Sequence, residues 1–168
     1  MTAPGDELVE IVDDDDRVVE IVPRRVMRAR RALHRCTYVF VLDPSGRLYV
    51  HRRTETKDVY PGYHDVVAGG VNGVGETYDA SAARELREEL GITAAPTYRF
   101  TQRYDGPDGR CFGAVYEVEW DGPIVWQPEE VAWGAFLPFE DVDASIAREP
   151  FCPDGLEMYE RWKKLPRV

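Results

Sequence analysis

The segment that decides the fold of this chain reads GVNGVGETYDASAARELREELGI and runs from Gly70 to Ile92. It opens with three glycines and a lone acid, which are Gly70, Gly73, Gly75 and Glu76. A helix is predicted from about Thr77 to Leu90, because Thr77 is a favourable N-cap residue and Gly91 is typical of the position just after a helix. The segment therefore predicts a glycine-rich loop followed by one helix.

The predicted helix has two different faces. An apolar stripe that suits packing on a sheet is made of Ala83, Leu86 and Leu90. Glu85, Glu88 and Glu89 are spaced i, i+3 and i+4, so their carboxylates converge on an adjacent stripe and repel one another. One interpretation is a solvated face neutralised by Arg84 and Arg87. The other is a site for a hard divalent cation such as Mg²⁺, which takes carboxylate oxygens and keeps positions for water and phosphate.

The wider pattern decides between these interpretations. Residues 70–92 match the Nudix box at its defined positions, which are Gly70, Glu76, Arg84, Glu85, Leu86, Glu88, Glu89, Gly91 and Ile92. The chain therefore resembles a Nudix hydrolase. The resemblance implies an α/β (α+β) layered sandwich, in which a mixed β-sheet lies between helices and residues 70–92 form a loop–helix–loop. It also implies one Nudix domain over residues 1–168.

The resemblance further implies a reaction. Nudix hydrolases cleave the diphosphate bond of a nucleoside diphosphate linked to another group, by attack of water on phosphorus, and divalent ions bridge the phosphates. The expected cofactor is Mg²⁺, or Mn²⁺, and the implied ligands are Glu85, Glu88, Glu89 and the Gly70 carbonyl. Glu85 and Glu89 are the expected catalytic residues, with general-base work placed first on Glu85. A second place for the base is a glutamate outside the box, Glu129 or Glu130, although both can also be plain surface acids.

Other charged residues complete the implied site. Glu76 and Arg84 match a pair of the box that usually acts structurally, so Arg84 is expected to bridge to Glu76 and to hold the glycine loop against the helix. Arg52 and Arg53 end a predicted strand that points toward the site. One of them could bind a substrate phosphate through two hydrogen bonds, and a surface role is the alternative.

Length and composition indicate a globular chain with one core. The sequence has 168 residues, of which 43% are hydrophobic and 31% charged. It has no apolar run of transmembrane length and no signal-peptide pattern at its start, so we expect a cytoplasmic protein without membrane contact. Its three cysteines are too few and too widely spaced to suggest a disulfide framework or a zinc site. Residues 1–6 are expected to be flexible.

The net charge, 21 − 31 = −10, limits the partners. A non-specific duplex binder normally carries a basic face, so long nucleic acid is not expected. The same acidity would repel a polyphosphate unless cations neutralise the site locally. We therefore expect a small-molecule diphosphate or nucleotide as substrate. A homodimer is an open alternative to a monomer.

Short segments on both sides of the long helix predict a layered domain. An N-terminal hairpin is expected from Leu8–Val12 and Val18–Val22, joined by the acidic, solvated turn Asp13–Asp16. The arginine-rich stretch Pro23–Ala32 is expected to form a short helix, either as a solvated basic face or as a surface for substrate phosphate. The remaining strands are predicted at Thr37–Leu42, Leu48–His51, Tyr98–Tyr104, Phe112–Trp120 and Glu129–Leu137, and the remaining helices at Pro138–Ala147 and Gly155–Leu165.

Motifs outside the box also resemble isopentenyl-diphosphate isomerase, a relative that shares the Nudix fold. They are Leu33-His34, Gly46-Arg47-Leu48, Arg52-Arg53 and Tyr60-Pro61-Gly62. The isomerase needs a cysteine and a histidine metal cluster near the start of its box, where this chain has Gly69 and Val71, and only His34 matches. The isomerase also lacks the complete box. We therefore expect an isomerase-like branch of the Nudix hydrolases that retained hydrolysis.

Three functions stay open: a metal-dependent hydrolase, an isomerase, and a non-catalytic Nudix-fold ligand sensor. The hydrolase is favoured because such sensors usually lose box residues and this chain has lost none. The box does not encode the substrate. Nucleoside di- and triphosphates, nucleotide sugars, dinucleotides, and prenyl or sugar diphosphates all remain.

Overall fold

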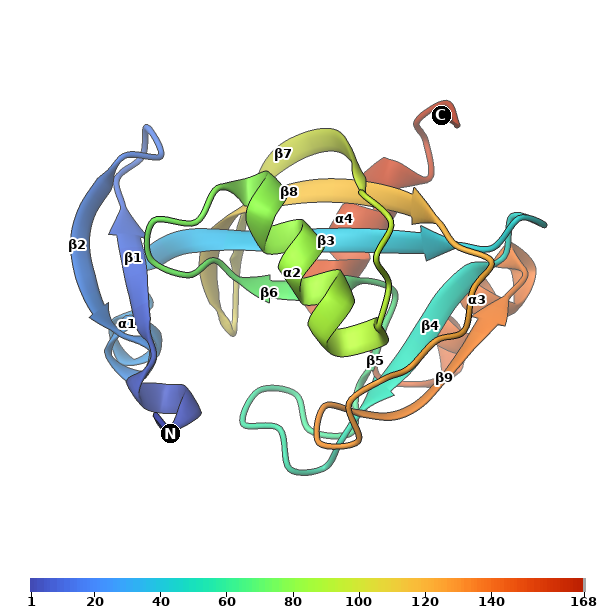
Figure 1. Cartoon of the computed structure of the whole chain (residues 1–168), viewed down its shortest axis with the longest axis horizontal. Coiled ribbons are helices and arrows are strands. Elements are labelled where there is room, and N and C mark those ends of the chain that lie inside the picture. Colours follow the sequence, from blue (N-terminus) through green and yellow to red (C-terminus); the bar gives the residue numbers. More distant parts are fainter. Residues whose placement is uncertain (168) are drawn as a thin grey trace.

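The computed structural model describes residues 1–167, and its centre is one mixed β-sheet (Figure 1). The strands are β1 (Leu8–Val12), β2 (Val18–Pro23), β3 (Leu33–Leu42), β4 (Leu48–Arg53), β5 (His64–Asp65), β6 (Ala68–Val71), β7 (Thr97–Gly106), β8 (Gly109–Glu119) and β9 (Val131–Leu137). The helices are the short 3₁₀ helix η1 (Pro4–Asp6), α1 (Arg24–Arg30), α2 (Tyr78–Leu90), α3 (Phe139–Arg148) and α4 (Pro153–Trp162).

Strand β3 is the axis of the sheet, because β1, β4, β6 and β8 all pair with it. Its sequence, LHRCTYVFVL, is nearly continuous in apolar residues, which is the pattern of a strand covered on both faces. It runs parallel to β8 over its whole length. It runs antiparallel to β6, where Tyr38 lies opposite Gly69. The predicted mixed sheet is thus confirmed.

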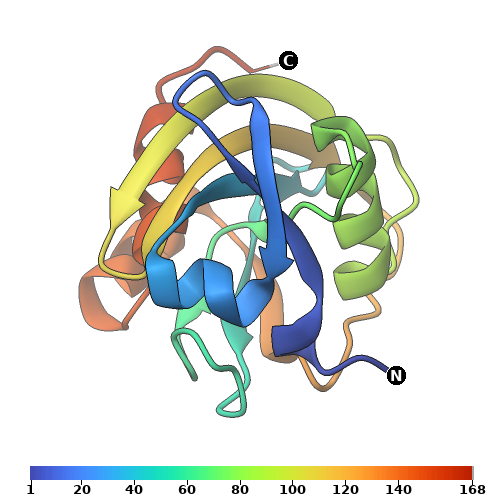
Figure 2. The same cartoon turned by 90° about the vertical axis from the view of Figure 1, so that its left-hand side faces the viewer.

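Helices cover both faces of the sheet, with α2 on one side and α4 on the other (Figure 1). The sheet is strongly curved between them, as Figure 2 shows. Successive β3 residues point to opposite faces, so Phe40 stacks on Trp162 of α4 with ring centroids 4.1 Å apart, whereas Val39 packs with Leu86 of α2. None of the helices within residues 1–167 combines the length and the apolar character that crossing a membrane requires.

Most predicted elements are confirmed in type, with shifted ends. β3 begins earlier than predicted, at Leu33, because its pairing with β8 extends to that residue. α4 begins at Pro153, since proline is well suited to the first helical position. Strands β5 and β6 were not predicted, because a strand of two to four residues is too short to show an alternating pattern. Pro4–Asp6, within the segment expected to be flexible, form η1, and Asp6 forms an ion pair with Arg25.

The N-terminal hairpin is present as predicted and contacts the glycine-rich segment. Glu10 of β1 accepts a hydrogen bond from the Gly75 N–H at 2.7 Å. The acidic turn is not simply solvated, because Asp16 accepts hydrogen bonds from Arg35 at 2.7 Å and from the Tyr78 hydroxyl at 2.9 Å. The expectation of a solvated turn is therefore wrong at Asp16, which holds the hairpin against the first residue of α2.

β6 approaches the axis strand so closely that position 69 requires glycine. Gly69 has a φ of 144°, a conformation that other residues rarely adopt. A Cβ atom at this position would lie 2.0 Å from the Thr37 carbonyl oxygen. The backbone therefore leaves no space for any side chain at this point of the sheet.

Replacing this glycine should destabilise the fold. Gly69→Ala is expected to lower the free energy of unfolding by about 3 kcal/mol or more, because the strained φ and the overlap both cost energy. Gly73→Ala is the matched control in the loop that follows β6, since its Cβ would contact only the Glu76 carboxylate, at 3.4 Å. Chemical denaturation measures both variants. Equal stabilities would show that β6 moves away from β3 at little cost.

Candidate functional site

Helix α2 is held at both ends and along one side, which fixes the direction of its acidic stripe. The Thr77 side chain accepts a backbone hydrogen bond within the first turn at 3.1 Å, and Gly91 ends the helix with a φ of 68°. Both predicted caps are thus confirmed. Leu86 and Leu90 of the predicted apolar stripe are fully buried against the sheet. The prediction is wrong at Ala83, which is only partly buried, because Ala82 faces the core instead. With the apolar stripe facing inward, the acidic stripe lies along the edge of the sheet at β6.

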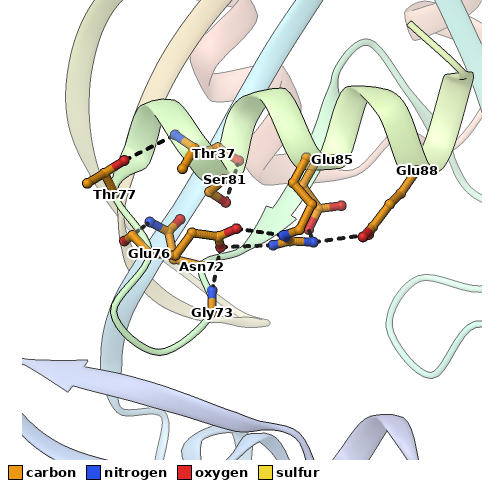
Figure 3. A network of polar contacts seen from close by, with 10 residues as sticks. Thr37, Asn72, Gly73, Glu76, Thr77, Ser81, Glu85 and Glu88 are labelled. Carbon is orange, nitrogen blue, oxygen red and sulfur yellow. Dashed lines mark hydrogen bonds and ion pairs between the residues drawn. The ribbon is translucent and has the colours of Figure 1, made fainter. Parts of the chain in front are cut away.

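The predicted bridge between Arg84 and Glu76 is present (Figure 3). Arg84 Nε donates to Glu76 Oε1 at 2.6 Å, and Arg84 Nη2 donates to Glu76 Oε2 at 3.0 Å. Glu76 also accepts a hydrogen bond from the Gly73 N–H at 2.7 Å. The hydrogen bond from Arg84 lowers the pKa of Glu76, so this carboxylate is charged over a wide pH range. The bidentate pair holds the glycine loop against α2.

The same guanidinium also contacts the acidic stripe. Arg84 Nη1 donates to Glu85 at 3.0 Å and to Glu88 at 3.1 Å, and the labelled carboxylates of Glu76, Glu85 and Glu88 surround it in Figure 3. The side chain of Glu88 is about half exposed, at 49%, whereas that of Glu85 is only 12% exposed. Nε and Nη2 of Arg84 therefore bind the loop, and Nη1 partly neutralises the acidic stripe.

Glu85 and Glu89 lie against the backbone of β6. A Cβ atom added at Gly70 would lie 2.8 Å from Glu85 Oε1, so the carboxylate occupies the space that the glycine leaves open. Glu89 accepts a long hydrogen bond, 3.4 Å, from the Gly69 N–H. Burial, and then the charge of Glu85, raise the pKa of Glu89 well above its usual value. Two acids thus lie close together with too little positive charge beside them.

These residues fit a hard divalent cation in their chemistry. Glu89 forms no ion pair within residues 1–167. The carboxylate oxygens of Glu85 and Glu89 are ligands that Mg²⁺ prefers. In the described part of the chain, no three acidic, histidine or cysteine side chains yet gather closely enough to enclose an ion. Arg84 lies between Glu85 and Glu88, so Glu88 must exchange this hydrogen bond before the three carboxylates can meet.

The acidic stripe opens into a cavity of about 310 Å³ that α1, α2, β3 and the loop after β4 line together. Basic side chains reach the same cavity, namely Arg24, Arg28, Arg53, Lys57, Arg84 and Arg110. Burial, followed by the charges of Arg24 and Arg53, lowers the pKa of Arg28. The cavity therefore presents carboxylates and cations to one ligand.

The two arginines that end β4 point to different places. Arg53 lines the cavity and donates to the Val59 carbonyl oxygen at 2.9 Å. Arg52 is exposed and is not among the lining residues. Consecutive strand residues face opposite sides of a sheet, so only one of the pair can reach the site.

The two glutamates before β9 also differ. Glu130 lines the cavity and forms an ion pair with Lys57. Glu129 is not among the lining residues, and its backbone carbonyl accepts a hydrogen bond from Thr54. Of the two candidates outside the box, the structure brings only Glu130 to the acidic stripe.

Sequence reasoning found part of the cavity and missed the rest. Arg24 and Arg28 belong to the arginine-rich stretch, for which a surface for substrate phosphate was one of two interpretations, and both line the cavity. Tyr38, Asp65 and Asp154 also line the cavity, but they come from β3, β5 and α4 and share no sequence motif. All three cysteines are free, buried and lining residues, although they are far apart in sequence.

Comparisons with known proteins agree with this geometry. A family model described as the NUDIX domain matches residues 32–162. "Uncharacterized Nudix hydrolase SCO1686" from Streptomyces coelicolor is 43% identical over 164 residues, which cover 96% of this chain and 91% of the relative. The crystal structure of DR0079 from Deinococcus radiodurans aligns with a TM-score of 0.78 and 29% identity, over 92% of this chain and 98% of that one.

A more distant structure shows the fold alone. The NUDIX domain of NrtR from Shewanella oneidensis, complexed with ADP ribose, aligns with a TM-score of 0.61 and 16% identity, over 79% of this chain and 86% of that one. The family match spans most of the chain, and the curated relative covers nearly all of it. The chain therefore belongs to the Nudix hydrolase family.

Proposed function

We propose that this protein is a Mg²⁺- or Mn²⁺-dependent hydrolase that cleaves the diphosphate bond of a nucleoside diphosphate-linked or related small molecule. Water attacks phosphorus in this reaction. One observation carries the proposal: Glu85 and Glu89 face the glycine backbone of β6 in a cavity that is also lined by arginines and a lysine. A diphosphate suits both groups, since its oxygens bind basic side chains directly and bind carboxylates through a divalent cation.

The proposed ligands of the cation are Glu85, Glu88, Glu89 and the Gly70 carbonyl. When bound, such an ion neutralises charge on the phosphate oxygens while water attacks. Glu88 joins the other two by leaving Arg84, which its exposed position allows. Arg84 keeps its two hydrogen bonds to Glu76, so the loop that carries the Gly70 carbonyl stays in place.

Glu85 is the first candidate for the base that takes a proton from the attacking water. Its carboxylate lies in the cavity beside Gly70, where a water on the substrate side is within reach. Glu130 is the second candidate, because it lines the same cavity and Lys57 positions its carboxylate. Glu129 falls behind Glu130, since it does not line the cavity.

Arg53 is proposed to bind a substrate phosphate, together with Lys57 and the first residues of α1. Arg24 supports this role because its Nε is buried without a hydrogen-bond partner in residues 1–167. A phosphate oxygen would supply the missing acceptor. Arg52 is left out of the proposal, since it is exposed on the other side of β4.

The isomerase alternative is not proposed. Its chemistry moves a proton onto and off carbon and needs a cysteine where this chain has Gly69, and the backbone there has no space for a Cβ atom. A cytoplasmic location is proposed from the sequence. A homodimer stays a prediction that the single chain does not test.

Activity should depend on a divalent cation. Excess EDTA is expected to abolish turnover, and added Mg²⁺ or Mn²⁺ should restore it, because the acidic stripe cannot bind a diphosphate without positive charge. The measurement is phosphate release from a panel of nucleotides, nucleotide sugars and other diphosphates. Water labelled with ¹⁸O should place label in one product phosphate. Undiminished turnover in EDTA would exclude the proposed mechanism.

The acidic stripe should carry the reaction. Glu85→Gln, Glu88→Gln and Glu89→Gln are each expected to lower kcat by about 10²–10⁴-fold, the scale on which single catalytic groups act, and to weaken Mn²⁺ binding in a direct titration. The fold should persist, because each change keeps the shape of the side chain. Glu140→Gln on α3 is the control, since Glu140 is exposed and remote from the cavity. Near-normal rates in all three variants would show a merely solvated face.

Arg84 should act through position. Arg84→Ala is expected to cost about 10–100-fold in Mn²⁺ affinity or in kcat/KM, because the loop that carries the Gly70 carbonyl loses its bridge. Arg87→Ala on the same helix is the control, since Arg87 is exposed and does not line the cavity. Arg84→Lys should recover only part of the loss, because lysine cannot form the bidentate pair. An Arg84→Ala variant with unchanged affinity and rate would show that the bridge is idle.

A further inference from the structure

The cavity has a second polar wall that the proposed reaction does not use. Tyr38 of β3, Asp65 of β5 and Asp154 of α4 all line it, together with the Glu85 and Glu89 wall. These three residues come from separate parts of the chain and are brought together only by the fold. Tyr38 and Asp65 are buried, and Asp154 is partly buried.

On this wall the Tyr38 and Asp154 side chains are bonded to each other, and Asp65 is bonded to the backbone. The Tyr38 hydroxyl donates to Asp154 Oδ2 at 2.9 Å and lies 3.4 Å from Cys111 Sγ. Asp65 Oδ1 accepts the Val66 N–H at 2.8 Å. Neither Asp65 nor Asp154 forms an ion pair in the described part of the chain. Two carboxyl groups therefore line the cavity without an ion pair in the described residues.

Two glycines make the space that this wall occupies. A Cβ atom at Gly113 of β8 would lie 2.6 Å from the Tyr38 ring. A Cβ atom at Gly155, in the first turn of α4, would lie 2.2 Å from Asp65 Oδ1. Any other residue at either position would displace the tyrosine or the carboxyl group. The positions of Tyr38 and Asp65 are thus built into the packing of the sheet against α4.

The chemistry of the wall selects one part of a diphosphate substrate. Phosphate oxygens bind the arginines directly and the acidic stripe through a divalent cation, so the phosphates belong at those two places and not beside the carboxyl groups of this wall. Burial, and then the charge of Asp154, raise the pKa of Asp65 to about 8, so at neutral pH this group is largely protonated and can both donate and accept hydrogen bonds. A hydrocarbon placed here would leave these polar groups without partners, which costs free energy.

We propose that Tyr38, Asp65 and Asp154 form the subsite for the organic group of the substrate, and that this group carries hydrogen-bond donors, as hydroxyl or amine groups. The inference rests on the proposed diphosphate hydrolysis and names its substrate class. A cavity of about 310 Å³ is at the low end of ligand sites, so the enclosed group is small, of the size of one sugar ring. Prenyl diphosphates, which lack such donors, are excluded from the class.

Three diphosphates built on a six-membered ring test this proposal in the full chain with Mg²⁺. They are glucosyl diphosphate, whose pyranose ring carries several hydroxyl groups, and aminocyclohexyl and cyclohexyl diphosphate, which differ from each other in one amine group. Wild-type protein is expected to prefer the glucosyl or the amino compound over the cyclohexyl compound by about 10–100-fold in kcat/KM, as one or two added hydrogen bonds would give. The compound with the higher kcat/KM of these two identifies the hydrogen-bond donor as hydroxyl or amine.

Variants connect the preference to the wall. Tyr38→Phe and Asp154→Asn should reduce it to a few-fold, by raising KM for the favoured ring while leaving KM for cyclohexyl diphosphate and the Kd of inorganic pyrophosphate unchanged. The matched controls are Tyr159→Phe and Asp143→Asn, because Tyr159 donates to Asp143 at 3.1 Å in the same kind of pair away from the cavity. These controls should keep the full preference.

Calorimetric binding of the same three compounds separates this inference from the proposed function. If none is cleaved but the glucosyl or amino compound binds more tightly than the cyclohexyl one, the reaction is wrong and the subsite stands. If all are cleaved with equal kcat/KM and bind equally, the reaction stands and the subsite is wrong. A preference that survives both Tyr38→Phe and Asp154→Asn would also overturn the subsite, since the selecting groups would lie elsewhere.

Discussion

The guanidinium group of Arg84 joins helix α2 to Glu76 in the glycine loop, and the geometry of the whole site depends on that contact. The helix fixes Arg84, and Arg84 fixes Glu76 through two hydrogen bonds, so the glycine loop cannot move independently of α2. The loop in turn continues into β6, whose backbone lies under Glu85 and Glu89. A single planar cation thereby relates the acidic side chains to the backbone that they face.

The walls of the cavity differ in charge, although the protein as a whole is strongly acidic. The acidic stripe lies on α2, the arginines lie mainly on α1 and at the end of β4, and a third wall holds Tyr38, Asp65 and Asp154, whose pKa values burial raises. Such an arrangement would be unstable if every group were charged and unpaired. It is consistent with a ligand that is anionic at one end and carries hydroxyl or amine groups at the other, as a sugar diphosphate does.

The sequence predicts the local part of this structure well and the long-range part poorly. Thr77, Gly91 and the spacing of Glu85, Glu88 and Glu89 act within one helix, so periodicity and capping rules suffice. The pair of Tyr38 with Asp154 joins residues that are 116 positions apart, and no pattern along the chain encodes it. The choice between Arg52 and Arg53 depended on the pleat of β4, which propensity alone does not give.

The contact of the N-terminal hairpin with the glycine loop changes where the domain physically begins. The family match starts at residue 32, yet Glu10 supplies the acceptor for the Gly75 N–H, and Asp16 supplies acceptors for Arg35 and Tyr78. A chain shortened to the matched residues would expose these donors at the base of the reactive loop. The first strands thus support the site, although the family match leaves them out.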